Sequence, residues 1–174
     1  MNSNLRRTSA VVVALVLAGA LVHAFGGDAA AGSNREGRLQ GTWRVQLNPR
    51  NCQTGAPIPS FSMLLSFHRG GTLTEVMNSP AFLPGQRTPG LGVWSHTHGK
   101  SYKGVWEAFI LFDSPTPPGL FKRGVQRLMQ DYEVDGDQLT IAASSQFFDT
   151  NGNLLGVTCA SGTGTRFEDV QDED

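Results

Sequence analysis

Short windows in which every second residue is apolar recur along this chain, and this period restricts the fold more than any other feature. In one window, Leu39, Trp43 and Leu47 alternate with polar residues. Successive side chains of a β-strand point to opposite faces, so the pattern predicts strands with one buried face. No window after residue 32 sustains the period of about 3.6 residues that marks an amphipathic helix. We therefore predict an all-β fold with eight strands, at about residues 39–47, 61–67, 72–77, 91–97, 102–112, 121–134, 138–148 and 154–167.

The connections between these predicted strands alternate between two kinds. Some are tight turns that contain glycine, as is typical of β-hairpins, and the others are long and rich in proline and glycine. In an up-and-down arrangement, alternate connections lie at the same end, so one end is closed and the other carries long loops. Closing the sheet also removes its exposed edges, and we predict an eight-stranded antiparallel up-and-down barrel. The tight turns are 69–71, 98–100 and 135–137, and the long loops are 48–59, 78–90 and 113–120.

The first 31 residues have the organisation of a secretory signal peptide. Two arginines precede an apolar run over residues 9–22, and a motif of small residues for cleavage ends at Ala24, with a second possible site after Ala31. The run is shorter than the roughly 18 to 20 residues that a comfortable spanning helix needs. We expect a secreted or periplasmic protein, and an uncleaved inner-membrane anchor is the alternative.

The rest of the chain is predicted to be one barrel domain, residues 32–168, because this length suffices for a single core. Residues 169–174 are expected to form a disordered acidic tail, since they hold almost nothing apolar to bury. The chain has a formal net charge of −1. A charge so near zero predicts no binding to nucleic acid.

Cys52 and Cys159 are the two cysteines of the chain. An even number of cysteines in an exported chain favours a disulfide. Both lie at the long-loop end of the predicted barrel, where the first and last strands are antiparallel neighbours. A reactive thiol pair is the alternative, although the chain lacks the Cys-x-x-Cys motif of such pairs. The predicted bridge closes most of the domain and would stabilise it by roughly 4 to 5 kcal/mol.

Two short motifs resemble the calycin superfamily, which includes lipocalins, avidins and fatty-acid-binding proteins. Gly41-Thr42-Trp43 in the first predicted strand has the Gly-x-Trp form, and Thr165-Arg166 in the last resembles the second mark of the family. The resemblance implies that Arg166 lies across Trp43 at the closed end of the barrel. The chain resembles a small bacterial lipocalin-like domain more than a typical secreted lipocalin.

The stretch WSHTHGKSY holds His96 and His98, whose spacing on a strand predicts that both rings share one face. His68 precedes the neighbouring tight turn at the same closed end. Three imidazoles at one end are weak candidates for a zinc or copper site. A polar, solvated turn is the favoured interpretation, and we expect no metal and no cofactor.

The candidate ligand-binding residues lie on the inner strand positions and in the loop 78–90. Glu75 shares strand parity with apolar neighbours, so it is a candidate inward carboxylate, with a rim position as the alternative. Phe82 and Leu83 form an apolar loop tip between prolines at the mouth. Trp106 and Ile110 are aromatic and aliphatic candidates for the interior wall.

The leading hypothesis is an exported barrel that binds a small hydrophobic or amphipathic molecule without catalysing a reaction. No catalytic residue is predicted, because the chain shows no Gly-x-Ser-x-Gly motif and no serine or cysteine with an assignable base. Two alternatives remain open. One is a protein-interaction or inhibitor-like module that uses its mouth loops, and the other is a barrel enzyme of isomerase or cyclase type.

Overall fold

The computed structural model describes residues 37–114 and 122–168. The predicted signal peptide, residues 1–31, and the predicted acidic tail, residues 169–174, lie outside the described residues. Within the described ranges, no helix has the length and apolar character that crossing a lipid bilayer would require.

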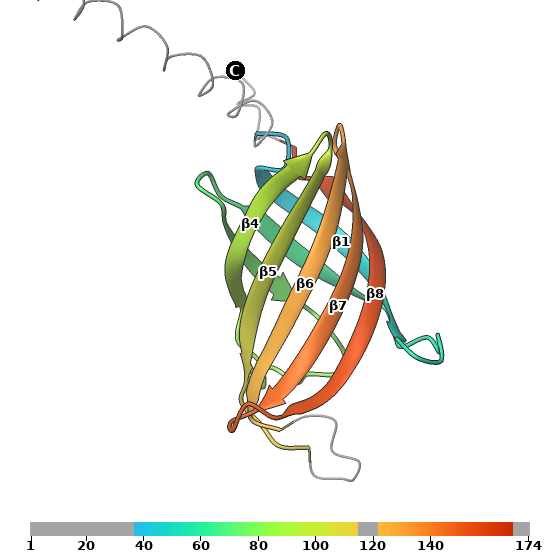
Figure 1. Ribbon diagram of the computed structural model, residues 1–174, viewed down its shortest axis with the longest axis vertical. Coiled ribbons are helices and arrows are strands. Elements are labelled where there is room, and N and C mark those ends of the chain that lie inside the picture. The colour runs from blue at the N-terminus through green and yellow to red at the C-terminus, as the bar shows by residue number, and fades with distance from the viewer. Residues whose placement is uncertain (1–36, 115–121, 169–174) are drawn as a thin grey trace, which may run out of the picture. The chain divides into compact units, whose positions relative to one another are not determined.

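The described residues form a closed antiparallel barrel of eight strands, each paired with its neighbours in the sequence (Figure 1). The last strand pairs with the first, with Trp43 opposite Arg166 and Asn51 opposite Thr158, and this pairing closes the sheet. The predicted all-β, up-and-down fold is confirmed. The strands are β1 (Gly41–Asn51), β2 (Phe61–Phe67), β3 (Thr72–Met77), β4 (Gly90–His98), β5 (Ser101–Ile110), β6 (Gly124–Asp135), β7 (Gln138–Asp149) and β8 (Leu154–Arg166).

The two ends of the barrel differ as the sequence predicts. The β2–β3, β4–β5 and β6–β7 turns lie together at the upper end in Figure 1, which we call the base. The β1–β2, β3–β4 and β7–β8 connections lie at the lower end, together with the end of β5 and the start of β6, and we call this end the mouth. The tight turn between β6 and β7 has a positive φ of 59° at Gly136, a conformation that favours glycine. Short turns close the base, whereas the longer connections can shape a binding site at the mouth.

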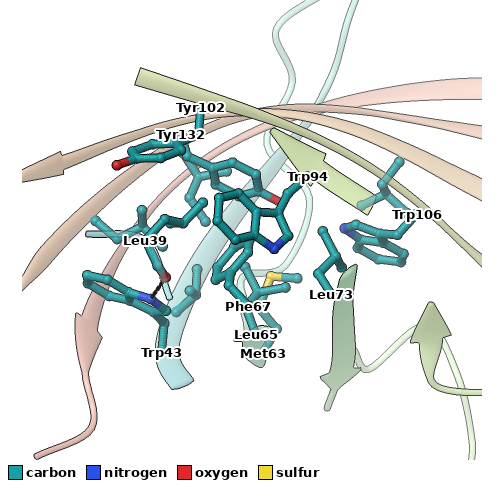
Figure 2. Packing of buried hydrophobic residues seen from close by; sticks show 14 of the residues in the cluster. Leu39, Trp43, Met63, Leu65, Phe67, Leu73, Trp94, Tyr102, Trp106 and Tyr132 are labelled. Carbon is teal, nitrogen blue, oxygen red and sulfur yellow. Dashed lines mark hydrogen bonds between the residues drawn. The ribbon is translucent and has the colours of Figure 1, made fainter. Parts of the chain in front are cut away.

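Aromatic side chains pack together in the half of the barrel nearer the base (Figure 2). Phe67 makes edge-to-face contacts with Tyr132, at 5.1 Å between ring centroids, and with Trp94, at 6.0 Å. Trp94 packs in turn against Tyr102. These four rings are almost fully buried, and edge-to-face pairs stabilise a core beyond the area that they bury. The base half of the interior is therefore packed, and space for a ligand has to lie nearer the mouth.

Trp43 and Arg166 seal the base, as the calycin resemblance implies. Trp43 is completely buried, and its indole nitrogen donates to the carbonyl of Leu39 at 2.9 Å. The guanidinium of Arg166 lies 4.2 Å from the centroid of the Trp43 ring. It also donates to the backbone carbonyls of Gln40 and Arg38 and pairs with a neighbouring aspartate. One side chain thus joins the first strand, the last strand and the segment before β1.

We expect Arg166→Ala to lower the free energy of unfolding by about 2 kcal/mol, because it removes a cation–π contact and two charged hydrogen bonds. Urea unfolding measures this change. Arg44→Ala is the matched control, since the guanidinium of Arg44 lies over Phe167 on the exposed outer surface. The control should change stability by less than about 0.5 kcal/mol. Equal effects of the two substitutions would show that Arg166 does not hold the base together.

The predicted disulfide between Cys52 and Cys159 is present, with a Cα–Cα distance of 5.1 Å across a sequence separation of 107 residues. Cys52 follows the end of β1, and Cys159 lies in β8 opposite Arg50. The bridge is therefore at the mouth, on the seam where the barrel closes. Base and mouth are each fastened across β1 and β8, by Arg166 at one end and by the disulfide at the other.

Candidate functional site

The histidines at the base do not form a metal site within the described residues. The β4–β5 register shifts between His96 and His98, so the prediction that both rings share one face is wrong. The bulge breaks the alternation on which that prediction depends. His96 is half-buried, with its ring 5.1 Å from Tyr102, whereas His98 is exposed. In residues 37–114 and 122–168, no group of three or more His, Cys, Asp or Glu side chains is placed to hold a metal.

A cavity of about 140 Å³ lies inside the mouth end of the barrel, and we call it the mouth cavity. Its wall is largely apolar, because inward positions near the mouth carry aliphatic and aromatic side chains. Four hydroxyl or amide side chains interrupt this wall, namely Ser79, Gln126, Ser145 and Thr158. The apolar lining includes Leu47, Phe61, Met77, Phe82, Leu128, Ala143, Phe147 and Ala160. Such a space accepts a small, mostly apolar molecule that carries a polar group.

The five predicted ligand-binding residues are distributed over different parts of the mouth end. Phe82 lines the mouth cavity and packs edge-to-face against Phe112. Leu83 is 68% exposed and lies outside the cavity. Glu75, Trp106 and Ile110 are buried but do not line it. Their direct contact with a ligand stays a prediction.

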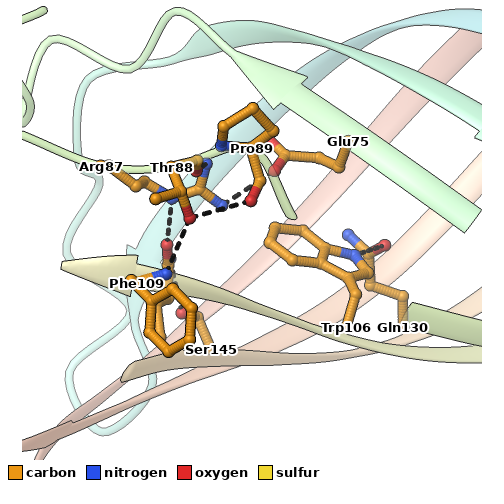
Figure 3. A network of polar contacts seen from close by, with 9 residues as sticks. Glu75, Arg87, Thr88, Pro89, Trp106, Phe109, Gln130 and Ser145 are labelled. Carbon is orange, nitrogen blue, oxygen red and sulfur yellow. Dashed lines mark hydrogen bonds and ion pairs between the residues drawn. The ribbon is translucent and has the colours of Figure 1, made fainter. Parts of the chain in front are cut away.

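Glu75 points inward and forms a buried ion pair with Arg87. The distance from Nη2 of Arg87 to Oε2 of Glu75 is 2.8 Å, and the two side chains are 5% and 0% exposed. Figure 3 shows the guanidinium reaching from the loop toward the carboxylate. Nε of Arg87 donates to Oε1 of Gln126 at 2.7 Å, and Nη1 donates to the carbonyl of Thr88 at 3.0 Å. The same guanidinium lies 5.3 Å from the centroid of the Trp106 ring.

Backbone hydrogen bonds between the β3–β4 loop and the mouth end of β5 hold Arg87 in place. Arg87 forms an isolated antiparallel bridge with Ile110. The backbone nitrogen of Thr88 donates to Phe109, and that of Leu111 donates to Gln86. These bonds fix the backbone on both sides of Arg87, so its side chain enters the barrel from the mouth.

Gly90 makes room for this arrangement. A Cβ atom at Gly90 would lie 2.6 Å from Cε3 of Trp106 and 2.7 Å from Oε2 of Glu75. Both distances are shorter than van der Waals contact, so any larger residue would push the indole or the carboxylate away. Because Gly90 pairs with Glu75 across β3 and β4, the glycine lets an acid and an aromatic face approach the same cation.

A second group of polar atoms lies deeper, around Gln130. Its Oε1 accepts hydrogen bonds from Nε1 of Trp106, at 2.9 Å, and from the hydroxyl of Tyr132. Two buried atoms, Oε1 of Glu75 and Nε2 of Gln130, have no hydrogen-bond partner among the described residues. Buried polar groups are usually paired, because an unmade hydrogen bond is costly. These two atoms are an acceptor and a donor that lie inside the barrel without a partner among the described residues.

Burial raises the pKa of Glu75 above its ordinary value, and the charge and hydrogen bond of Arg87 oppose this rise. The pKa of Tyr132 is also raised, by burial and by the nearby charge of Glu75. Loss of water penalises the charged forms of both groups. The carboxylate of Glu75 thus depends on the cation beside it.

Arg87, Gln126, Gln130 and Gly90 were not among the residues predicted from the sequence. Gln126 and Gln130 share strand parity with Leu128 and the other buried residues of β6, so alternation alone would have identified them as inward polar groups. Arg87 is the one charged residue in the loop 78–90. The side chain of Arg87 points into the barrel because the backbone of its loop pairs with β5. No local sequence pattern predicts this pairing.

No family model matches the sequence, and no curated protein matches it. Among solved structures, the chain is similar to "Crystal Structure of Rv2717c from M. tuberculosis", with a TM-score of 0.37 and 17% sequence identity, over 79% of this chain and 98% of that chain. A likeness at this level carries no argument about function, so the candidate site rests on the contacts described above.

Proposed function

We propose that this chain is an exported, calycin-like barrel that binds one small, mostly apolar molecule in the mouth cavity and does not transform it. The observation that carries the proposal is the cavity itself, an apolar space at the end of the barrel where the long loops gather. Ligand sites in barrels occur preferentially at such mouths. The disulfide supports export, because disulfides persist in oxidising compartments.

The size of the cavity limits the ligand. Pockets for drug-sized molecules measure about 300 to 1,000 Å³, whereas the mouth cavity measures about 140 Å³. A dry apolar cavity of about 150 Å³ can hold benzene. The ligand is therefore a single ring or a short branched chain, with a polar group that hydrogen-bonds to Gln126 or Ser145.

Catalysis of the isomerase or cyclase type would require an acid or base that reaches the ligand. Glu75 is the buried carboxylate nearest to this role, but its Oε2 is held by Arg87 and its side chain does not line the mouth cavity. A molecule in the cavity would meet Gln126 and Ser145 instead. We therefore propose binding rather than catalysis.

Filling the cavity tests the proposal. We expect Ala143→Leu, which adds a branched side chain inside the mouth cavity, to weaken binding of 2-phenylethanol at least tenfold. Ala142→Leu is the matched control, because Ala142 is the exposed neighbour on the outer face of β7. Isothermal titration calorimetry measures both affinities. Equal affinities in the two variants, or no binding by the unmodified protein, would refute the proposal.

Phe82 is expected to cover the bound molecule. Phe82→Ser should weaken 2-phenylethanol binding by about 1 to 2 kcal/mol, the worth of a half-buried large apolar side chain, and leave the melting temperature nearly unchanged. Leu83→Ser changes the adjacent, exposed residue and should leave the affinity unchanged. A second control, His96→Ala with His98→Ala, alters the base. If the histidine variant lost binding and Phe82→Ser kept it, the binding site would lie at the base.

A further inference from the structure

The guanidinium of Arg87 is surrounded by groups that attract cations. Around it lie a carboxylate oxygen of Glu75 at 2.8 Å, an amide oxygen of Gln126 at 2.7 Å and the face of Trp106 at 5.3 Å. The ring of Phe82 lies 6.0 Å away. A carboxylate beside an aromatic face attracts alkylammonium and guanidinium ions alike, through charge and through the ring quadrupole.

The walls of this site and its occupant come from different parts of the fold. Glu75, Trp106 and Gln126 lie on β3, β5 and β6, three strands of the closed barrel. Arg87 lies on the connection between β3 and β4. The side chain of Arg87 can rotate while its backbone stays bonded to β5, and strand pairing keeps the walls of the site in place. The cation site would therefore persist if Arg87 left it.

The cation site also adjoins the mouth cavity. The side chains of Phe82 and Gln126 line that cavity, and both also contact the guanidinium of Arg87. Behind the guanidinium, Oε1 of Glu75 has no partner among the described residues. A ligand that replaced Arg87 would find a carboxylate with an unused acceptor, next to an apolar space that holds one ring.

Charge decides which ligands can make this exchange. A neutral or anionic molecule in the place of Arg87 would leave a buried carboxylate without its cation, which is strongly destabilising. A cationic ligand would keep the interior neutral, because one buried cation replaces another. The exchange also releases the guanidinium of Arg87 to water.

We propose that the barrel binds an amphipathic organic cation, a primary ammonium or guanidinium that carries one small apolar group, by displacing Arg87 from Glu75. The head group takes the place of the Arg87 guanidinium against Glu75, Gln126 and Trp106. The apolar group fills the mouth cavity, and in this respect the inference rests on the proposed function. The guanidinium of Arg87 then competes with the ligand for Glu75, and only a positively charged ligand displaces it.

Removing the competitor tests this inference. In Arg87→Ala at pH 8, 2-phenylethylammonium should bind at least tenfold more tightly than it binds the unmodified protein, and more tightly than the neutral 2-phenylethanol binds the same variant. Glu75→Gln with Arg87→Ala should bind both probes equally. Arg127→Ala breaks the exposed pair of Arg127 with Glu107 and should leave both affinities unchanged. Calorimetric titration of the four proteins gives these ratios.

A second readout covers the case in which Arg87→Ala folds poorly. Millimolar 2-phenylethylammonium should then raise the melting temperature of that variant, or restore its folded circular dichroism spectrum, whereas 2-phenylethanol should not. Equal binding of amine and alcohol by Arg87→Ala, or no rescue by the amine, would overturn the inference. If 2-phenylethanol binds the unmodified protein and the amine shows no preference, the proposed function stands and only the cation site fails. If 2-phenylethanol binds none of the proteins, the proposed function fails, while amine binding by Arg87→Ala would still support the cation site.

Discussion

Replacing both cysteines, in Cys52→Ala with Cys159→Ala, is expected to lower the free energy of unfolding by about 4 to 5 kcal/mol, the chain-entropy value for a loop of about 107 residues. The bridge joins β1 and β8 at the mouth, so it restricts the unfolded chain over most of the barrel. Urea unfolding of the oxidised protein and of the double variant measures the difference.

Reducing the unmodified protein is the control for the substitutions themselves, because it breaks the same bond and leaves both side chains in place. The reduced protein and the double variant should lose similar stability. Disulfides typically stabilise a protein by about 2 to 4 kcal/mol. If both proteins lost less than about 1 kcal/mol of unfolding free energy, closure at the mouth would not depend on the disulfide.

Breaking the buried ion pair from one side is expected to be nearly as costly. Arg87→Met should lower the free energy of unfolding by about 3 kcal/mol at pH 8, because it leaves Glu75 buried without a cation. Glu75→Gln with Arg87→Met removes both charges and should cost much less. Urea unfolding of the unmodified protein, Arg87→Met, Glu75→Gln and the double variant forms a cycle that measures the coupling between the two side chains.

The cost of Arg87→Met should also depend on pH. Burial raises the pKa of Glu75 in the folded protein, and in this variant no guanidinium opposes the rise. The folded state then binds a proton more tightly than the unfolded state, so stability is greatest at low pH and falls as pH rises through the folded pKa. Arg87→Met should thus be more stable at pH 5 than at pH 8, relative to the double variant. A pH-independent difference would mean that Glu75 is not held in a dry site.

The sequence predicted the strands and the two ends of the barrel because both depend on local signals. Alternation located the buried faces of β1 and β7, and glycine marked the tight turns of the base. The even number of cysteines in an exported chain predicted the disulfide, and the pairing of the first and last strands brought Cys52 and Cys159 to the same end. These inferences needed only the alternation of apolar residues, the residues typical of tight turns, the number of cysteines and the order of the strands along the chain.

The site could be predicted only in part, because its contacts depend on tertiary packing. Parity indicated the inward direction of Glu75, and the loop position of Phe82 indicated the mouth. The side chain of Arg87 enters the barrel because its loop pairs with β5. A loop lacks the alternation that predicts side-chain direction in a strand. The bulge at His96 likewise broke the alternation that predicted a shared face with His98. The cavity is lined by side chains from six strands and their loops, so its volume depends on tertiary packing that no single stretch of sequence encodes.

A crystal structure of the protein soaked with 2-phenylethanol would show directly where a small apolar molecule binds. We predict electron density for the phenyl ring in the mouth cavity, between Phe61, Phe82 and Phe147, with the hydroxyl of the ligand near Gln126 or Ser145. Density at the base beside His96, or an empty mouth cavity in a crystal that binds the molecule elsewhere, would contradict it.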